Sequence, residues 1–354
     1  MRYFLMIFVI ILVSCSEEET PSTGSGNNDD SGYDGINKLY VCDQTSESNK
    51  VYILDPTTLD SLGEVSINFT EDTTDEEQPH FVAIDEANGY WFVTATQTGY
   101  VGMYDLETDV LIDSIQVGSM PALLAVDDLT QTLYVSRMMP MPGMPSMDSY
   151  KLNRLDYSNG SFVELDNVCL APTGEFLEFP NPHAISFSNN TSRDGGTLVS
   201  ASFNSDWLSR TDIWSATAYQ TVHQPFTEGQ ASPDYQENKL FPLAVTQKDD
   251  YAFYSCSGTA DSDVQVSGQV QSWVVGEALD PYLKSIYNSE SEDSPFTSSS
   301  MLWHIVESPV ESEIFVVSSS GDNVGVTCLS YNNAEDFTDS NGNNEWDEGE
   351  EFID

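Results

Sequence analysis

Residues 79–118 read PHFVAIDEANGYWFVTATQTGYVGMYDLETDVLIDSIQVG. Four short runs rich in Val, Ile, Phe and Tyr follow one another, and turn-forming residues such as Asn-Gly and Thr-Gly separate them. Short runs of β-branched and aromatic residues between turn signals are typical of β-strands joined by tight turns. This stretch therefore predicts a four-stranded antiparallel meander, and the rest of the chain can be tested for copies of it.

The opening of this unit recurs along the chain. Each copy is followed, one turn later, by an aromatic-rich strand. The starts are spaced by about 40 to 60 residues, which is the spacing of the blades of a β-propeller. The unit starts are Pro79–Asp85, Pro121–Asp127, Pro182–Ser188, Pro242–Gln247 and, more weakly, Trp303–Glu307. We therefore expect an all-β chain folded as a β-propeller, whose strands read as apolar runs because both faces of each blade are buried.

The number of blades follows from these starts. Leu39–Cys42 and Val51–Leu54 look like the second and third strands of a unit with no first strand, so five starts and this partial unit predict six blades. Seven blades remain possible if a degenerate unit lies within 205–240 or 258–300. Propeller rings are commonly closed by strands from both chain ends, and residues near 36–44 and 314–331 are the candidates for that closure.

One family resemblance is carried by the best-formed unit. Its pattern is Pro-x-x-Val-Ala-x-Asp from Pro79, then Val101-Gly-Met-Tyr-Asp-Leu-Glu-Thr, then Leu111-Ile-Asp-Ser-Ile-Gln-Val-Gly118. This resembles a YVTN/YncE-type propeller repeat. The resemblance covers about residues 36–331, is good in the second and third units and fades later. It implies a propeller fold and no particular reaction, because propellers host unrelated functions.

The charge of the chain excludes whole classes of partner. Among 354 residues there are 11 Lys and Arg against 58 Asp and Glu, a formal net charge of −47. A protein that tracks nucleic-acid phosphates needs a cationic surface, so nucleic-acid binding is excluded. Charge-driven docking on anionic lipid is disfavoured for the same reason. The hydrophobic content of 39% is sufficient for a large core rather than a disordered chain.

The N-terminal segment predicts export and a lipid anchor. Residues 1–14 read as a signal peptide, with Arg2 before an apolar stretch too short to span a bilayer. The stretch ends in Leu-Val-Ser-Cys15, which resembles a bacterial lipobox with Cys15 as the acylated residue. Residues 15–35 form a flexible linker. Its acidic start resembles the surface-export signal of Bacteroidota-type lipoproteins, so we expect an outer-membrane lipoprotein facing the cell surface or the periplasm.

The C-terminal tail, residues 333–354, follows the predicted propeller of residues 36–332 and resembles a calcium loop. Calcium loops place oxygen ligands at positions 1, 3, 5, 7, 9 and 12. The tail supplies them in this register from Asp339, Asn341, Asn343, Glu345 (by its backbone carbonyl), Asp347 and Glu350. We expect a structural calcium ion there, and the alternative is a disordered acidic tail.

Three of the four histidines fall near one repeat position, at the start of the strand that lines the propeller axis: His80, His183 and His304. In a six-blade ring they belong to alternate blades, so their imidazoles are expected around the axis. Such a set suits zinc or copper with an open position for water or substrate. The alternative is that the imidazoles hydrogen-bond neighbouring blades. His304 follows Trp rather than Pro, so its register can differ by one residue.

A second metal candidate is a methionine-rich segment in the third unit. Pro and Gly separate the methionines, so the segment must be a loop. Thioether ligands suit Cu(I), and the alternative is a packing or partner-binding patch. The methionines are Met138, Met139, Met141, Met144 and Met147.

The cysteines are compatible with one disulfide at the ring closure. With Cys15 acylated, four cysteines remain, an even number in an exported protein. Cys42 and Cys328 lie near the two ends of the predicted ring, so we favour a Cys42–Cys328 bridge. The alternative is that the cysteines are buried free thiols.

Two functional hypotheses follow. The sequence contains no Gly-x-Ser-x-Gly elbow, P-loop or His-Glu-x-x-His motif, so no catalytic signature stands out. We favour a membrane-anchored, non-enzymatic module that binds a protein, glycan or small ligand at the mouth of the propeller channel. The alternative is a copper-type metal-binding protein or metal-dependent oxidoreductase that uses the histidine ring.

Overall fold

The computed structural model describes the body of the chain as β-strands and their connections. No helix occurs among the described residues, and the expected all-β class is confirmed. The described residues are 38–44, 48–70, 76–137, 151–170, 182–193, 195–202, 206–215, 217–227, 240–261, 264–276, 280–291, 296–308, 312–320 and 323–330.

The strands form six antiparallel sheets, which are the six blades of a β-propeller, and one small hairpin. Blade 1 contains β1 (Leu39–Cys42), β2 (Lys50–Leu54) and β3 (Ser61–Ser66). Blade 2 contains β4 (Pro79–Asp85), β5 (Tyr90–Ala95), β6 (Tyr100–Asp105) and β7 (Leu111–Gln116). Blade 3 contains β8 (Pro121–Asp127), β9 (Thr132–Arg137), β10 (Lys151–Asp156) and β11 (Val163–Cys169).

The second half of the chain follows the same plan. Blade 4 contains β12 (Pro182–Ser188), β13 (Thr197–Ser202), β14 (Trp207–Ile213) and β15 (Tyr219–Pro225). Blade 5 contains β16 (Pro242–Lys248), β17 (Tyr251–Cys256), β20 (Gln269–Val274) and β21 (Tyr282–Tyr287), with the hairpin β18 (Thr259–Asp261) and β19 (Val264–Val266) inserted. Blade 6 contains β22 (Met301–Glu307), β23 (Glu313–Ser320) and β24 (Asn323–Ser330).

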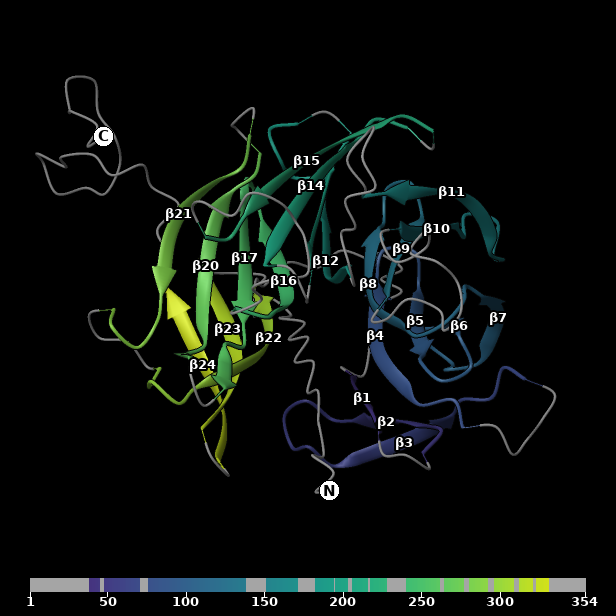
Figure 1. The fold of residues 1–354 in the computed structure, drawn as a ribbon. Helices are drawn as coiled ribbons and strands as arrows, with labels where there is room; N and C mark the ends of the chain where they lie inside the picture. Colours follow the sequence, from purple (N-terminus) through teal and green to yellow (C-terminus); the bar gives the residue numbers. More distant parts are fainter. Residues whose placement is uncertain are drawn as a thin grey trace, which may run out of the picture.

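The blades are arranged around a common axis. Figure 1 looks roughly along it, and the first strands β4, β8, β12, β16 and β22 stand nearest the centre. Along the series from β4 to β22, each inner strand packs against the inner strand of the following blade. The six-blade prediction is therefore confirmed, and the regions 205–240 and 258–300 contribute strands to blades 4 and 5 rather than a seventh blade.

The apolar runs in the sequence correspond to strands buried on both faces. The second strands β5, β9, β13 and β17 are buried at almost every position, whereas the outer strands β3, β7 and β21 are largely exposed. This gradient identifies the three strands of blade 1 as a second, third and fourth strand, since exposed β3 lies at its rim. The expectation that β1 and β2 lack a preceding inner strand agrees with this arrangement.

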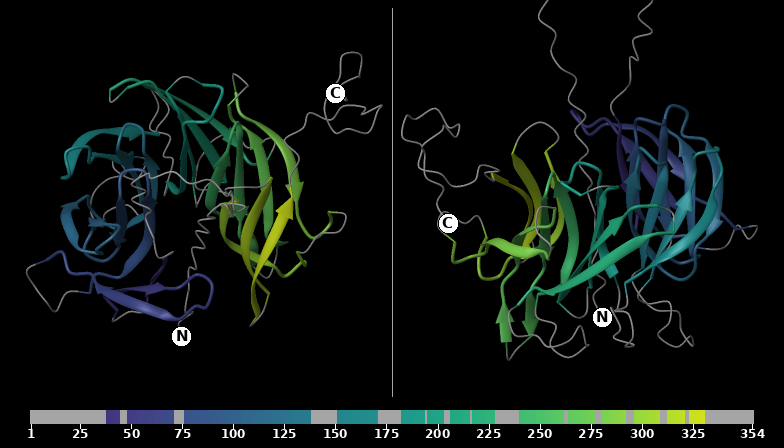
Figure 2. Two further views of the ribbon diagram at one scale, coloured as in Figure 1. Left: turned by 180° about the vertical axis from the view of Figure 1, so that it is seen from behind. Right: turned by 90° about the horizontal axis from the view of Figure 1, so that it is seen from above.

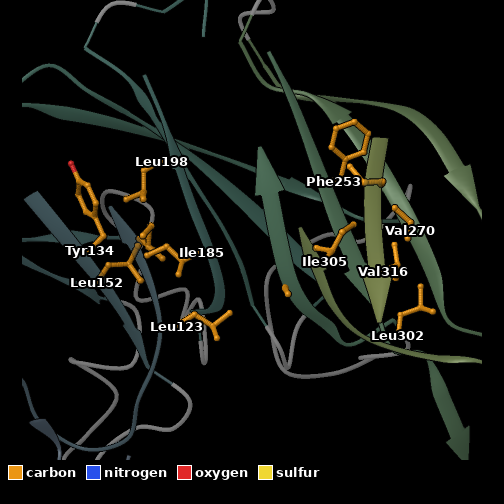
Figure 3. Close-up of a cluster of buried hydrophobic side chains, with 14 of the residues drawn as sticks. Leu123, Tyr134, Leu152, Ile185, Leu198, Phe253, Val270, Leu302, Ile305 and Val316 are labelled. Carbon is orange, nitrogen blue, oxygen red and sulfur yellow. The ribbon is translucent and has the colours of Figure 1, made fainter. Parts of the chain in front are cut away.

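The core consists of layers of side chains between neighbouring blades. Figure 3 shows one cluster, in which Tyr134, Leu152 and Leu198 lie between blades 3 and 4, and Phe253 and Val316 between blades 5 and 6. Between blades 1 and 2, Trp91 stacks on Tyr104 with ring centroids 4.1 Å apart. Burial of this apolar area, at about 25 cal/mol per Å², holds the blades together.

The ring closure differs from the expectation. Within the described residues β1 pairs only with β2, and β24 pairs only with β23, so no strand from one chain end completes a blade at the other. In Figures 1 and 2 the coloured ribbon is correspondingly interrupted between yellow blade 6 and purple blade 1. The expected Cys42–Cys328 bridge is not formed, because Cys42 is a free thiol. Cys42 is buried among the side chains between blades 1 and 2, whereas Cys328 is exposed on β24.

Candidate functional site: the histidine face

The inner strands share an irregularity at their first residues. In all five, the pairing with the second strand shifts register immediately after the strand begins, so an extra residue is accommodated in a β-bulge. A bulge redirects side chains and twists the strand where it enters the blade. The shifts lie between Pro79 and Val82, Pro121 and Leu124, Pro182 and Ala184, Pro242 and Ala244, and Leu302 and His304. The face of the propeller at which these strands begin is called the histidine face below.

The bulge places two of the histidines at equivalent positions and the third one residue later. His183 is the extra residue of β12, whereas the extra residue of β22 is Trp303. His304 pairs with Val317 as Ala184 pairs with Ala201. The one-residue offset that the Trp-His sequence allowed is therefore present, because Trp303 occupies the bulge position that His183 occupies in β12.

The structure nevertheless brings the three imidazoles together at the axis. The rings of His80 and His183 are in edge-to-face contact with centroids 5.9 Å apart, and His304 contacts the ring of Phe81 at 5.8 Å. All three histidine side chains are buried, with 3 to 7% of their surface exposed. Among the described residues, however, no group of three His, Cys, Asp or Glu side chains is placed to hold a metal ion. The transition-metal site stays a prediction without geometric support.

Burial determines the charge state of this cluster. It lowers the pKa of His80 to about 3, and the neighbouring His183 and His304 contribute in the same direction. It lowers the pKa of His304 to about 4, again with a contribution from His183. The pKa of His183 is also lowered by burial, with partial compensation from a hydrogen bond to the Leu243 carbonyl. The three imidazoles are consequently neutral at pH 7.

Side-chain hydrogen bonds link blades 1, 2 and 3 each to the bulge of the next blade. The Thr94 hydroxyl of blade 2 donates to the carbonyl of Ala122 (2.8 Å), and the Ser136 hydroxyl of blade 3 donates to the carbonyl of His183 (2.7 Å). Gln44 of blade 1 donates to the carbonyl of His80 over 2.9 Å. Each bond satisfies a carbonyl that the bulge diverts from the strand ladder.

His183 supplies the corresponding hydrogen bond from blade 4 to blade 5, where no hydroxyl side chain is present. Thr94 and Ser136 lie opposite the bulge in β5 and β9, and the corresponding residue of β13 is Ala201, which has no donor. The imidazole of His183 lies 2.7 Å by its Nδ1 from the carbonyl of Leu243 in blade 5. Because a carbonyl only accepts, Nδ1 carries the proton. His183 thus takes the place of the hydroxyl that links blades 2 and 3 to their successors.

The strand ends that the longest connections join lie at the histidine face. Because adjacent strands are antiparallel, the connections that lead into inner strands and those between second and third strands lie at this end. They include residues 67–78, 138–150, 170–181, 226–241, 257–268 and 288–300. At the opposite end, called the turn face below, the longest connection is 189–196.

Several predicted sites lie outside the described residues. These are the lipidation residue Cys15, the methionines from Met138 to Met147 and the calcium-loop residues from Asp339 to Glu350. The described residue before the methionine segment is Arg137, whose guanidinium donates to Asn153 Oδ1 over 3.1 Å and to the carbonyl of Val117. The cation that precedes this segment is therefore held by blade 3 and by the connection from blade 2.

Sequence reasoning missed two buried polar features. In the first, the Asp212 carboxylate forms ion pairs with Arg193 (2.8 Å) and Arg210 (3.2 Å). Arg210 also donates a hydrogen bond to the carbonyl of Val275 in blade 5. In the second, burial raises the pKa of Glu307 at the turn face to about 7, against an opposing effect of Lys248. Arg210 and Asp212 are close in the sequence, but Arg193 and the Val275 carbonyl are not, and Glu307 is far in the chain from Lys248. No local pattern therefore identifies either feature. The hydroxyl donors Thr94 and Ser136 did have one, since they occupy the same position in two aligned units.

Comparison with known proteins supports the propeller fold and does not identify a family or an activity. No protein family model and no curated protein matches the chain. Among solved structures it is similar to a functionally unknown protein from Desulfotomaculum acetoxidans DSM 771, at 12% identity and a TM-score of 0.54 over 84% of this chain and 79% of that one. It is also similar to Kuenenia stuttgartiensis hydrazine synthase, at 14% identity and a TM-score of 0.52 over 79% of this chain and 70% of that one.

A third similar structure is a virginiamycin B lyase from Staphylococcus aureus, at 11% identity and a TM-score of 0.50 over 79% of this chain and 73% of that one. The names describe unrelated activities, as expected for a fold that hosts many functions. Across the residues that the structure describes, no helix is long and apolar enough to cross a membrane.

Proposed function

We propose that this chain is a divergent YVTN/YncE-like propeller that works as a lipid-anchored, non-enzymatic binding module of the cell envelope and takes its ligand at the histidine face. The observation that carries this proposal is the asymmetry of the two faces. The strand ends joined by long connections lie together with the histidine-bearing strand starts at one end, and the strand ends joined by short turns lie at the other. Variable connections on a rigid scaffold are where binding residues are commonly found.

The chemistry of the histidine cluster supports binding rather than catalysis. A general base needs a pKa near the operating pH and access to the substrate. The imidazoles of His80 and His304 have pKa values near 3 and 4 and are more than nine-tenths buried. The Nδ1 of His183 is committed to a backbone carbonyl. The cluster therefore suits a structural support beneath the binding connections, which keeps the strand starts in place.

Charge narrows the class of ligand. With a net charge of −47, the chain repels polyanions over the range of the Debye length, about 8 Å at physiological ionic strength. We expect the ligand to be an uncharged glycan or a neutral to basic polypeptide of the envelope. The tail from Asp339 to Glu350 would bind calcium in a structural role.

Site-specific photo-crosslinking in the producing cells tests the binding face. A photoreactive phenylalanine analogue replaces Gln97, an exposed residue of the β5–β6 connection at the histidine face. The matched control replaces Leu129, which is 76% exposed in the β8–β9 connection at the turn face. A discrete adduct is expected from position 97 and not from position 129. Adducts from position 129 alone would contradict the proposal.

The anchor has its own test. Cys15→Ala removes the acceptor of the lipid, so the variant is expected to leave the membrane fraction and to lose metabolic labelling with palmitate. Persistence of the variant in the membrane fraction would contradict the lipid anchor while leaving the binding face untouched.

A further inference from the structure

No strand of the described chain lies beside the outermost strand of blade 6. Blades 2 to 5 each contain four strands, whereas the described part of blade 6 consists of β22, β23 and β24, so β24 occupies the place that a third strand takes elsewhere. Its side chains are exposed as those of a rim strand are: Val324 is 73% exposed and Val326 50%. A strand at the edge of a sheet presents unpaired backbone N–H and C=O groups, which can pair with another chain.

Most of the other rim strands have features that disfavour pairing with another chain. Charged side chains and irregular pairing with the neighbouring strand are two of these devices. β3, β7, β11 and β21 each combine a charged residue with a shift in register against their neighbour; the charged residues are Glu64, Asp113, Glu164, Asp166 and Lys284. β15 has neither device, but it ends in Pro225.

β24 has none of these devices. It is eight residues long with the sequence NVGVTCLS, which contains no charged residue and no proline. Its pairing with β23 runs without a register shift from Asn323 to Ser330. Val326 lies directly opposite Val317, which is half-buried, so β24 extends a partly apolar face. A long, regular and neutral edge of this kind favours addition of a strand.

We propose that β24 is a docking edge for an extended segment of a partner polypeptide, which pairs with it antiparallel and completes blade 6. The segments of this chain that adjoin the body are poor donors. Residues 331–354 contain nine Asp and Glu and no Lys or Arg, and residues 16–37 are rich in Gly, Ser, Pro and acidic residues. Charge and Gly/Pro content of this kind disfavour a strand.

A second copy of the chain is also a poor donor. Two copies that paired through β24 would bring together bodies that each carry a net charge of −47, and β24 itself offers no opposite charge. The partner that fits is a neutral to basic segment with alternating apolar residues. Backbone hydrogen bonds would supply affinity, and side chains opposite Val324 and Val326 would supply selectivity.

The probe is a capped peptide with the β21 sequence YLKSIY and one added lysine at each end, because β21 completes blade 5 and carries a positive charge. Hydrogen exchange of full-length protein is measured with and without this peptide. We expect exchange of the β24 amides to slow at least about tenfold at saturating peptide. Val326→Asp is expected to weaken binding at least about tenfold. Val163→Asp on the charged rim strand β11, where the side chain is 49% exposed, is expected to leave binding unchanged.

Four outcomes would overturn the proposal. Binding that Val326→Asp leaves intact, or no protection of β24, shows that the edge does not accept a strand. Protection of β24 before peptide is added, lost on deletion of residues 331–354, shows that the chain's own tail occupies the edge. A dimer that Val326→Asp converts to a monomer assigns the edge to a second copy. None of these outcomes bears on the photo-crosslinking test at the histidine face.

Discussion

At the residue scale, His183 of the histidine cluster joins two blades by a hydrogen bond. Three imidazoles near an axis suggest a metal ligand set, and the contacts of His183 show a role in joining two blades. Its Nδ1 supplies the hydrogen bond that Thr94 and Ser136 supply in the two preceding blades. A buried carbonyl without such a donor costs about 1–3 kcal/mol, so selection for stability alone can account for an imidazole here.

The role of His183 predicts that its loss can be partly compensated by a hydroxyl at position 201. His183→Ala is expected to lower the free energy of unfolding by about 2–4 kcal/mol, because it leaves the Leu243 carbonyl without its donor and opens a cavity. Ala201→Ser, added to that variant, places a hydroxyl where Ser136 stands in blade 3 and is expected to recover about 1 kcal/mol. Urea unfolding measures both effects. Ala201→Ser alone should bring no gain, and an equal gain in the wild-type background would contradict the replacement.

The low pKa values of the cluster predict acid sensitivity. His304 takes up a proton near pH 6.5 when unfolded but only near pH 4 when folded. The unfolded state therefore binds more protons between these values, and stability falls as the pH decreases from about 6.5 toward 4 by about 1.4 kcal/mol per pH unit for this residue. His304→Gln removes this contribution.

The destabilisation caused by His304→Gln at pH 7 is therefore expected to shrink by about 1–2 kcal/mol at pH 5. Urea unfolding at both pH values gives the two differences. A loss that is the same or larger at pH 5 would show that the imidazole is charged in the folded state.

At the scale of the element, apolar layers and buried polar links join consecutive blades. The link between blades 4 and 5 is the most highly charged of those described. Asp212 of β14 is 2% exposed and pairs with two guanidiniums, both of which donate to backbone carbonyls of blade 5. A buried ion pair adds little net stability, yet removal of one partner leaves an uncompensated charge.

Asp212→Asn is accordingly expected to lower the free energy of unfolding by about 3–5 kcal/mol, because Arg193 and Arg210 then face each other without a carboxylate. The matched control is Glu64→Gln, which breaks an ion pair with Lys50 of 2.6 Å between side chains that are 41% and 48% exposed. That change is expected to cost less than about 1 kcal/mol. Chemical unfolding compares the two, and similar losses would mean that the Asp212 cluster is effectively solvated.

At the scale of the whole molecule, the ring has a weak point between blades 6 and 1. Blades 2 to 5 each pack against two neighbours, whereas no strand is exchanged between the described parts of blades 1 and 6. Blade 6 also contacts blade 2 directly, because the ring of His304 lies against the ring of Phe81. Local opening of a structure begins where apolar contacts are fewest.

Native-state hydrogen exchange is expected to follow this difference. Amides of β1 in blade 1 and β24 in blade 6 should exchange at least about tenfold faster than those of β9 in blade 3 and β13 in blade 4. Detaching an end blade breaks only one interface between blades, whereas exposing blade 3 or 4 breaks two. Mass spectrometry of peptic fragments resolves these strands. Uniform protection around the ring would show that the chain ends close it as firmly as the other interfaces.

The sequence by itself determined the strand units, their number and the burial of their faces. The stretch from Pro79 to Gly118 contains the alternation of apolar strands and turns, and its copies contain the repeat. These signals are local or periodic, so they survive without knowledge of the fold. The same repeat logic predicted that His80, His183 and His304 would meet at the axis, because equivalent positions of a ring face a common centre.

Only the tertiary structure decided what those positions do. His304 lies one residue beyond the bulge position of β22, and His183 reaches the Leu243 carbonyl of the next blade. Asp212 pairs with Arg193 and Arg210 within blade 4. Each of these contacts depends on which atoms the folded strands bring together. The bare edge of β24 likewise depends on the absence of a fourth strand in the described part of blade 6. Hydrogen bonds and ion pairs act over a few ångströms between residues far apart in the chain, so no local pattern in the sequence encodes them.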